Sequence, residues 1–206
     1  DQMLYYLPLT GSTFKKVYYD QNKRRAISQF VPAEDLVVPY AATDLRSAER
    51  ISHVLRMTAN ELRKLQVAGV YRDVELSPDS EDADTDTIRA SGDELQGIRP
   101  NYNDDIHTIL ECHVDLDLEG FEDMNAMGAP TGIGLPYIVT IDEGSGEVLS
   151  VVRNWREEDA LKQKRDYFVH FRFLPGFGFY GFGLLHTIGG LSQAATSILR
   201  QLIDAG

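Results

Sequence analysis

The hydrophobic and polar positions of this chain predict mostly strands before residue 175 and one long helix after it. The clearest alternation runs over 106–118, and a period of two places successive side chains on opposite faces of a strand. We therefore expect a strand with one apolar face, which includes Cys112. The other face, expected to be wet, carries four side chains of types that ligate metals: Glu111, His113, Asp115 and Asp117.

Two hairpins are predicted from runs of β-branched and aromatic residues that flank short polar turns. The first pairs 13–19 with 26–31, and the second pairs 136–142 with 148–155 around Glu143–Gly146. Shorter runs of the same kind predict three further strands: Leu36–Val38, Ile51–Met57 and Tyr167–Leu174.

Two helices are predicted from capping signals and from helical spacing. Thr58 and Glu61 have the spacing of a capping box and Gly69 is a natural stop, so a short helix is expected over 59–68. A second helix, about 35 Å long, is expected over 182–205. Its apolar residues step by four and three along one seam that suits packing against other helices: Leu184, Ile188, Leu191, Ala195, Ile198 and Leu202.

These elements predict an α+β fold with two regions. Residues 1–174 form a mixed, mostly antiparallel β region with short helices, and residues 175–206 form a joint and the long helix. The joint is rich in glycine and aromatic residues and is expected to depend on four of them: Gly176, Gly178, Tyr180 and Gly181. Because the chain opens at Asp1 without a start methionine, we expect it to be a piece of a longer protein.

Composition and charge exclude several classes of protein. Hydrophobic residues make up 43% of the chain and charged residues 25%, which is typical of a globular protein. The single cysteine rules out an internal disulfide framework and a multi-cysteine zinc site. A net charge of -12 argues against a protein that coats nucleic acid. The acidic excess lies within 73–125, where the stretch 77–105 is expected to contain a solvated loop at 77–87.

Two segments leave open a metal- or nucleotide-binding enzyme domain. Residues Gly176–Gly181 match G-x-G-x-x-G after a strand, a pattern that lets backbone approach a pyrophosphate. The bulky Phe177 and Phe179 oppose this interpretation, because the loop should be open. The Glu111–Asp117 strand face is the candidate metal site, although no HExxH helix or second histidine pair supports it. The chain has no GxSxG nucleophile motif.

Three other patterns have simpler explanations. Asp82, Asp84 and Asp86 resemble the start of a calcium loop, but a solvated acidic loop explains them as well. The run 173–199 has the length of a membrane span, yet its many glycines favour a helix buried between protein neighbours. The basic and aromatic residues of 15–25 are compatible with nucleic-acid contact or with a solvated hairpin tip.

A resemblance extends over most of the chain, in the same order along the sequence. The segments that carry it are Leu7–Asp20, Phe30–Tyr40, Leu135–Asp142, Val152–Trp155, Phe173–His186 and Leu199–Gly206. They resemble the wing and the first stem helix of the portal (head-to-tail connector) proteins of tailed bacteriophages. Residues 77–105 and 119–134 resemble this family least.

The resemblance implies a structural subunit and not an enzyme. Portal rings usually contain twelve copies, occupy one capsid vertex, and conduct double-stranded DNA without sequence specificity during packaging and ejection. They dock terminase, capsid proteins and tail or adaptor proteins. The implied location is the virion, with assembly in the host cytoplasm, and no cofactor, metal or membrane is implied. On this interpretation the clip, the second stem helix and the crown lie outside the present sequence.

Overall fold

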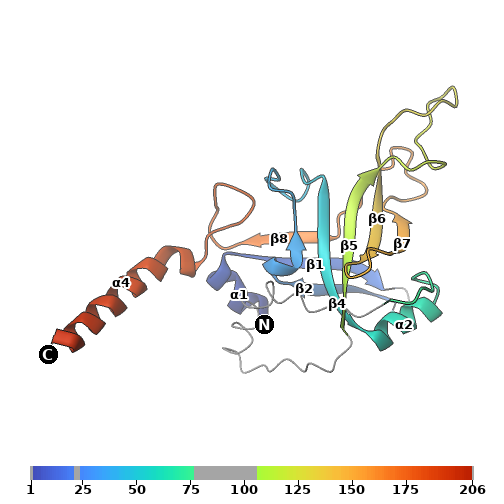
Figure 1. Cartoon of the computed structure of the whole chain (residues 1–206). Coiled ribbons are helices and arrows are strands. Elements are labelled where there is room, and N and C mark those ends of the chain that lie inside the picture. Colours follow the sequence, from blue (N-terminus) through green and yellow to red (C-terminus); the bar gives the residue numbers. More distant parts are fainter. Residues whose placement is uncertain (1, 21–23, 77–105, 206) are drawn as a thin grey trace. The chain divides into compact units, whose positions relative to one another are not determined.

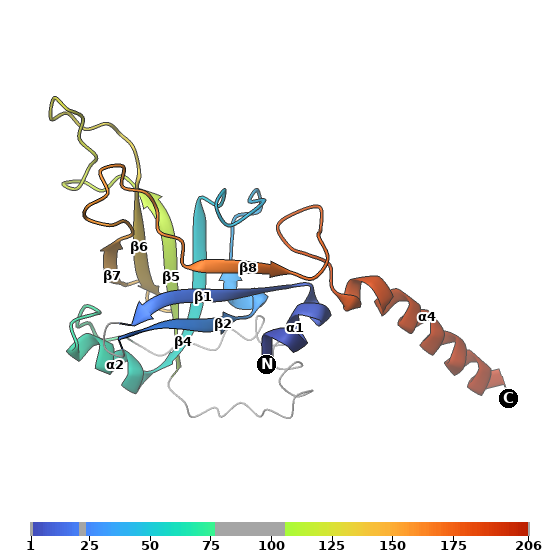
Figure 2. The same ribbon diagram turned by 180° about the vertical axis from the view of Figure 1, so that it is seen from behind.

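The computed structural model describes residues 2–20, 24–76 and 106–205, and Figures 1 and 2 show it from opposite sides. The chain divides into two compact units. Unit 1 contains the residues up to Ile51 and from Lys164 onward, and unit 2 contains Ser52–Gln163. The predicted α+β class is confirmed by two antiparallel sheets and a long C-terminal helix. The acidic stretch 77–105, with its candidate calcium loop, lies outside the described residues.

Unit 1 is built on a three-stranded sheet with the order β2-β1-β8. The predicted first hairpin is confirmed, because β1 (Ser12–Asp20) pairs antiparallel with β2 (Arg25–Val31). β8 (Phe168–Arg172), the predicted last strand, pairs antiparallel with the other edge of β1. The early and late segments of the chain therefore lie side by side in this unit.

The apolar core of unit 1 covers one face of this sheet. Phe14 of β1 is fully buried, and its cross-strand partners are Val31 and His170. The buried residues come from all three strands, from residues 36–51 and from the loop before the last helix: Phe14, Val31, Leu36, Ala42, Ala48, Ile51, Phe168 and Phe179. Burying this apolar surface is the main favourable contribution to folding.

The sequence does not predict α1 (Gln2–Thr10), because Pro8 stands inside it. Proline lacks the N–H that a helix interior needs, so the pattern favours a non-helical segment. Tertiary contacts support the helix nevertheless. The ring of Tyr6 lies 5.6 Å from that of Phe30 in β2. α1 also contacts β1 and the C-terminal helix.

The other strands form a five-stranded sheet with the order β3-β4-β5-β6-β7. They confirm the remaining strand predictions and the second hairpin: β3 (Leu36–Val37), β4 (Arg50–Thr58), β5 (Ile106–Leu116), β6 (Leu135–Asp142) and β7 (Val148–Arg153). A short 3-10 helix, η1 (Ala33–Asp35), precedes β3. In the β5–β6 pair, Cys112 lies opposite Val139 and Glu111 opposite Thr140.

The predicted short helix is confirmed as α2 (Ala59–Val67), with both of its end signals. The Thr58 hydroxyl accepts the Glu61 N–H, and the Glu61 carboxylate accepts the Thr58 N–H, which completes the capping box. At the other end Gly69 has a φ of +72°, and its N–H donates to the Gln66 carbonyl. Glycine adopts this left-handed conformation without steric cost, so it ends the helix.

The prediction that β5 has one wet face is wrong over His107–His113, where both faces are largely covered, and it holds at Asp115, which is exposed. On the face predicted to be wet, His107, Ile109 and His113 are at most 3% exposed. Ile109 packs in a cluster with Leu62 of α2 and Leu149 of β7. The other face of β5 contributes Val114 and Leu116 to a separate apolar cluster. Their partners there include Leu135, Tyr137 and Val139 of β6. The alternation assigns residues to faces correctly, but it does not reveal that α2 covers the second face.

Candidate assembly interface on the C-terminal helix

The predicted long helix is present as α4 (Leu184–Ala205), which runs away from the three-stranded sheet of its own unit (Figures 1 and 2). From Leu184 to Asp204 every residue except Gly189 is exposed. That set includes all six residues of the predicted seam: Leu184, Ile188, Leu191, Ala195, Ile198 and Leu202. Leu191 is 72% exposed and Leu202 is 65% exposed. The helix therefore presents its apolar seam along its whole described length.

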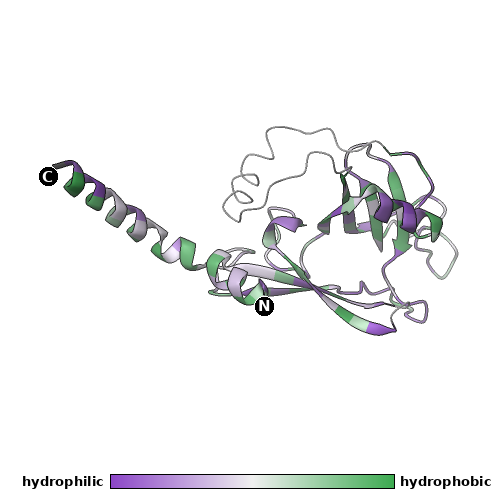
Figure 3. Cartoon of the chain, turned by 90° about the horizontal axis from the view of Figure 1, so that it is seen from below, coloured by the Kyte–Doolittle hydropathy of each residue, from purple (hydrophilic) through white to green (hydrophobic). Residues whose placement is uncertain are grey.

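The apolar face of α4 is wider than the predicted seam. Leu185, Leu199 and Ile203 are 58%, 60% and 77% exposed, and helical spacing places them along one flank of the seam. Helical spacing places mostly polar residues on the other sides, and Figure 3 shows purple bands among green ones along α4: Gln193, Ser197, Arg200, Gln201 and Asp204. A narrow seam suits one helical neighbour, whereas a face wider than about 100° is typical of a helix packed against more surface. Leu185, Leu199 and Ile203 follow the same helical period, but they lie beside the line of residues spaced by three and four that defines the predicted seam.

The joint between unit 1 and α4 depends on glycines whose backbones approach closely. A Cβ atom on Gly183 would lie 2.5 Å from the nitrogen of Gly11, and one on Gly181 would lie 2.6 Å from the Gly11 carbonyl oxygen. Gly11 also has a φ of +89°, a conformation that side chains rarely allow. No larger residue fits at these positions without a shift of the backbone, so the start of α4 is held directly against the segment after α1.

Hydrogen bonds stabilise the same contact. The Oγ of Ser12, a residue that is 1% exposed, accepts the Gly181 N–H at 2.8 Å. The Phe173 N–H donates to the Gly11 carbonyl at 3.0 Å. Leu174 and Phe182 exchange two backbone hydrogen bonds and form an isolated antiparallel bridge. Residues 175–181 thus form a loop that is closed by the Leu174–Phe182 bridge, and α4 begins two residues after Phe182.

Of the four residues predicted to form the joint, two have no space for a side chain. A Cβ on Gly176 would overlap the Tyr180 carbonyl oxygen, and Gly181 contacts Gly11 as described. Gly178 is unconfined, because a Cβ atom there would have nothing within 4 Å. Tyr180 is 46% exposed, and the partial burial raises the pKa of its phenol. Gly11 is not predictable as a joint residue, because its partners lie about 170 positions away, beyond the reach of any local pattern.

A stack of three rings anchors the loop to the core of unit 1. The centroid of the His170 ring lies 4.4 Å from that of Phe14 and 4.9 Å from that of Phe179. His170 Nε2 is 3.2 Å from the Oγ of Ser12, the same atom that holds Gly181. Burial, and secondarily the Arg172 guanidinium, lowers the pKa of His170 to about 4. The imidazole is therefore neutral at neutral pH and suits an apolar stack.

The segments considered for enzyme chemistry show no arrangement that favours it. In the Gly176–Gly181 loop, the confined glycines face the chain's own backbone and Phe179 is 6% exposed. On β5, His113 Nε2 lies 2.8 Å from Glu111 Oε1, while Asp115 and the following Asp117 are exposed. Within 2–20, 24–76 and 106–205, no three His, Cys, Asp or Glu side chains are grouped as a metal site requires.

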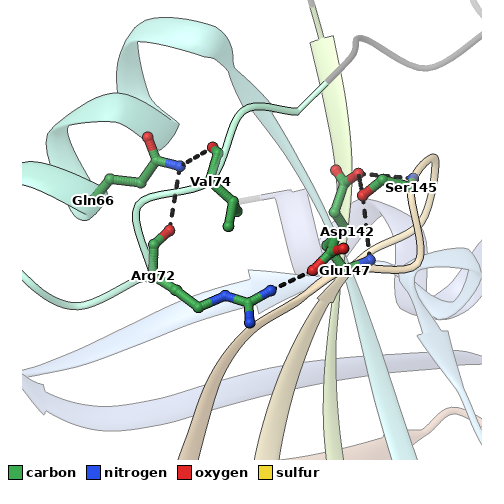
Figure 4. A network of polar contacts seen from close by, with 6 residues as sticks. All are labelled: Gln66, Arg72, Val74, Asp142, Ser145 and Glu147. Carbon is green, nitrogen blue, oxygen red and sulfur yellow. Dashed lines mark hydrogen bonds and ion pairs between the residues drawn. The ribbon is translucent and has the colours of Figure 1, made fainter.

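The best-connected polar groups of unit 2 support its own loops (Figure 4). The Gln66 amide donates to the Arg72 carbonyl at 3.3 Å, and the Arg72 guanidinium pairs with the Glu147 carboxylate. The Asp142 carboxylate accepts the Ser145 N–H at 2.9 Å and its hydroxyl at 2.6 Å. These contacts connect the end of α2 to the β6–β7 hairpin and shape its turn, which is a structural role.

Comparisons with other proteins add no assignment. No known protein family matches the sequence, and no curated protein does. Among the helices of the described residues, none combines the length and the apolar character that crossing a membrane requires.

Proposed function

We propose that this chain is a structural subunit of a portal ring of the kind that tailed bacteriophages carry at one capsid vertex. The observation that carries the proposal is the apolar face of α4, which is exposed along its length and held by the glycine joint. The ring conducts double-stranded DNA without sequence specificity, and it docks terminase, capsid proteins and tail or adaptor proteins. It acts in the virion after assembly in the host cytoplasm, without catalysis or a cofactor.

The apolar side chains of α4 supply the driving force for assembly. Fully burying one Leu or Ile side chain stabilises a protein by about 1.5–3 kcal/mol relative to leaving it in water. Leu191, Leu202 and Ile203 are each at least 65% exposed, so most of this gain remains available to a partner. Exposed apolar faces of this extent are typical of interaction sites.

A ring accounts for the width of that face. In a cyclic oligomer each subunit contacts two neighbours through different surfaces. A helix between two copies of itself then buries the seam against one neighbour and the flanking residues Leu185, Leu199 and Ile203 against the other.

The resemblance of the sequence selects a portal among ring-forming proteins. The segments that carry it include Phe173–His186 and Leu199–Gly206, and these contain the joint and both ends of α4. The net charge of -12 supports the same proposal, because a strongly basic wall would retain DNA by its phosphates instead of letting it pass.

Leu191→Asp tests the proposal. Leu191 is 72% exposed within one chain, so the variant is expected to fold as the parent does. Burying its unpaired carboxylate between copies would cost several kcal/mol, so assembly is expected to be lost in sedimentation velocity. Gln193→Asp adds the same charge to the polar side of α4 and should leave assembly intact. Normal assembly of the Leu191→Asp variant would refute the role of this face.

A further inference from the structure

Two surfaces outside α4, one in each unit, carry opposite charge and are not part of the proposed contact between helices. The described residues of unit 1 include ten basic and seven acidic side chains, whereas those of unit 2 include seven basic and fifteen acidic. Charge complementarity of this kind steers association and selects partners. The individual residues show where each surface lies.

The first surface is the loop 117–134 of unit 2, which connects β5 to β6 and exposes large apolar side chains. Met127 is 94% exposed, and Phe121 and Ile133 are 60% and 59% exposed. Methionine and aromatic residues are enriched in protein interfaces relative to the rest of the surface. Several such side chains on one loop distinguish it from a merely solvated connection.

This loop is held in shape by its own polar contacts. Asn125 Oδ1 accepts the N–H groups of Met127 and Ala129 at 2.9 and 3.0 Å. The Asp123 carboxylate accepts the Thr131 hydroxyl at 3.0 Å and binds the Lys162 ammonium at 2.5 Å. Because these bonds preorganise the loop, docking it costs less conformational entropy.

Exposed carboxylates flank the apolar side chains of the loop. Asp115, Asp117 and Glu119 are all exposed, and none of them forms an ion pair with a residue that the structure describes. Asp123, by contrast, is already paired with Lys162. The three exposed carboxylates can therefore face a basic partner, and they disfavour nucleic acid because they repel phosphates.

The second surface is the part of the unit 1 sheet face turned away from its core that α1 leaves open, since Tyr6 of α1 packs on Phe30, the partner of Lys15 on that face. Because Phe14 faces the core, the side chains of Lys15, Val17 and Tyr19 lie on the opposite face of β1. Val17 is 41% exposed and Tyr19 is 61% exposed. Val169 of β8 is paired with Lys15 on the same face and is 45% exposed.

Two basic side chains lie beside this apolar face. Lys15 lies on it, and the Lys15 ammonium is 5.9 Å from the centroid of the Phe171 ring. Arg24, directly before β2, is exposed at the end of the hairpin. The hairpin face, defined as Lys15, Val17, Tyr19, Arg24 and Val169, thus has an apolar centre with two basic residues beside it.

We infer that the loop 117–134 of one copy docks on the hairpin face of the neighbouring copy. The inference rests on the proposed ring. Met127 and Phe121 cover Val17 and Tyr19 of the neighbour, and Asp115 with its neighbouring carboxylates faces the two basic residues. The contact is heterologous, since each copy uses a different surface toward each neighbour, as closure of a ring requires.

Charge reversal with complementation tests the contact. Asp115→Lys with Asp117→Lys reverses two of the three exposed carboxylates beside the loop, and Lys15→Glu with Arg24→Glu makes the hairpin face acidic. Each double variant alone is expected to lose most of its assembly in sedimentation velocity. An equal mixture of the two is expected to assemble, because every loop then meets a hairpin face of opposite charge. Rescue by mixing separate chains requires a contact between copies.

The control is Glu157→Lys with Glu158→Lys, an equal charge change at two exposed positions of unit 2 outside the loop. It should assemble as the parent does. If the parent assembles and both reversed variants assemble equally well alone, this inference is wrong and the proposed ring stands. The inference also fails if the variants lose assembly and mixing does not restore it. If the parent does not assemble at all, the proposed ring itself is wrong.

Discussion

A Cβ atom on Gly183 would lie 2.5 Å from the backbone nitrogen of Gly11, although the two residues are far apart in the sequence. Real Cβ atoms do not approach other atoms so closely, so the pair requires glycine at both positions. The contact sets the direction in which α4 leaves unit 1. A ring that packs α4 against its copies depends on that direction.

Gly183→Ala is expected to destabilise the chain by about 1–3 kcal/mol, the usual cost of overpacking. Gly190→Ala is the matched control, because nothing lies within 4 Å of its Cβ position. Alanine favours a helix interior over glycine by about 0.5–1 kcal/mol, so the control should be as stable as the parent or more so. Urea unfolding measures both. Equal stabilities for the two variants would contradict the close approach at the joint.

Phe179→Ala is expected to cost about 3–5 kcal/mol, since a ring that is 6% exposed would leave a cavity in the core of unit 1. Phe177 belongs to the same loop but is fully exposed, so Phe177→Ala should change stability little. Thermal unfolding of the two variants compares them directly. A large loss for Phe177→Ala and a small one for Phe179→Ala would reverse the assignment of the anchoring ring.

His170 makes the stability of the chain depend on pH. Its pKa is about 4 in the folded chain against an ordinary 6.5, so between these values the unfolded chain binds more protons. Stability from this group is complete above pH 6.5 and declines as the pH falls from 6.5 toward 4. His170→Phe keeps a ring in the stack without a titrating group. Urea unfolding should therefore show a weaker loss of stability on acidification for this variant, and an unchanged loss would exclude His170 as its source.

Thr58→Ala removes the hydroxyl that caps α2 and should cost about 1 kcal/mol. Thr58→Ser keeps an oxygen in the same place and is expected to retain most of the stability. The melting temperatures of the two variants decide the matter. If the alanine variant has the same melting temperature as the serine variant, the cap contributes nothing to stability.

Local patterns predict the elements of this fold well wherever the determining residues are close in sequence. The capping box of Thr58 and Glu61, both hairpins and the long helix all follow from contacts a few residues apart. The helix α1 does not follow, because Pro8 opposes it locally and packing of Tyr6 on Phe30 supports it from a distance. Tertiary contacts override local propensity in this way.

The candidate site is also predictable only where its residues are close in sequence. The seam of α4 is readable from its spacing, whereas the joint depends on Gly11, whose partners lie at the far end of the chain. The burial of Ile109 is likewise unreadable from the β5 pattern, because Leu62 of α2, a separate element, packs in the same cluster. Periodicity shows which residues share a face but not what lies against that face.

Electron microscopy of the negatively stained protein tests the central claim most directly. The specimen is this chain together with any longer product that its gene encodes, at concentrations that favour assembly. Rings with a central hole and a symmetry near twelvefold are the predicted result. Uniform small particles without rings, at every concentration, would contradict a portal subunit.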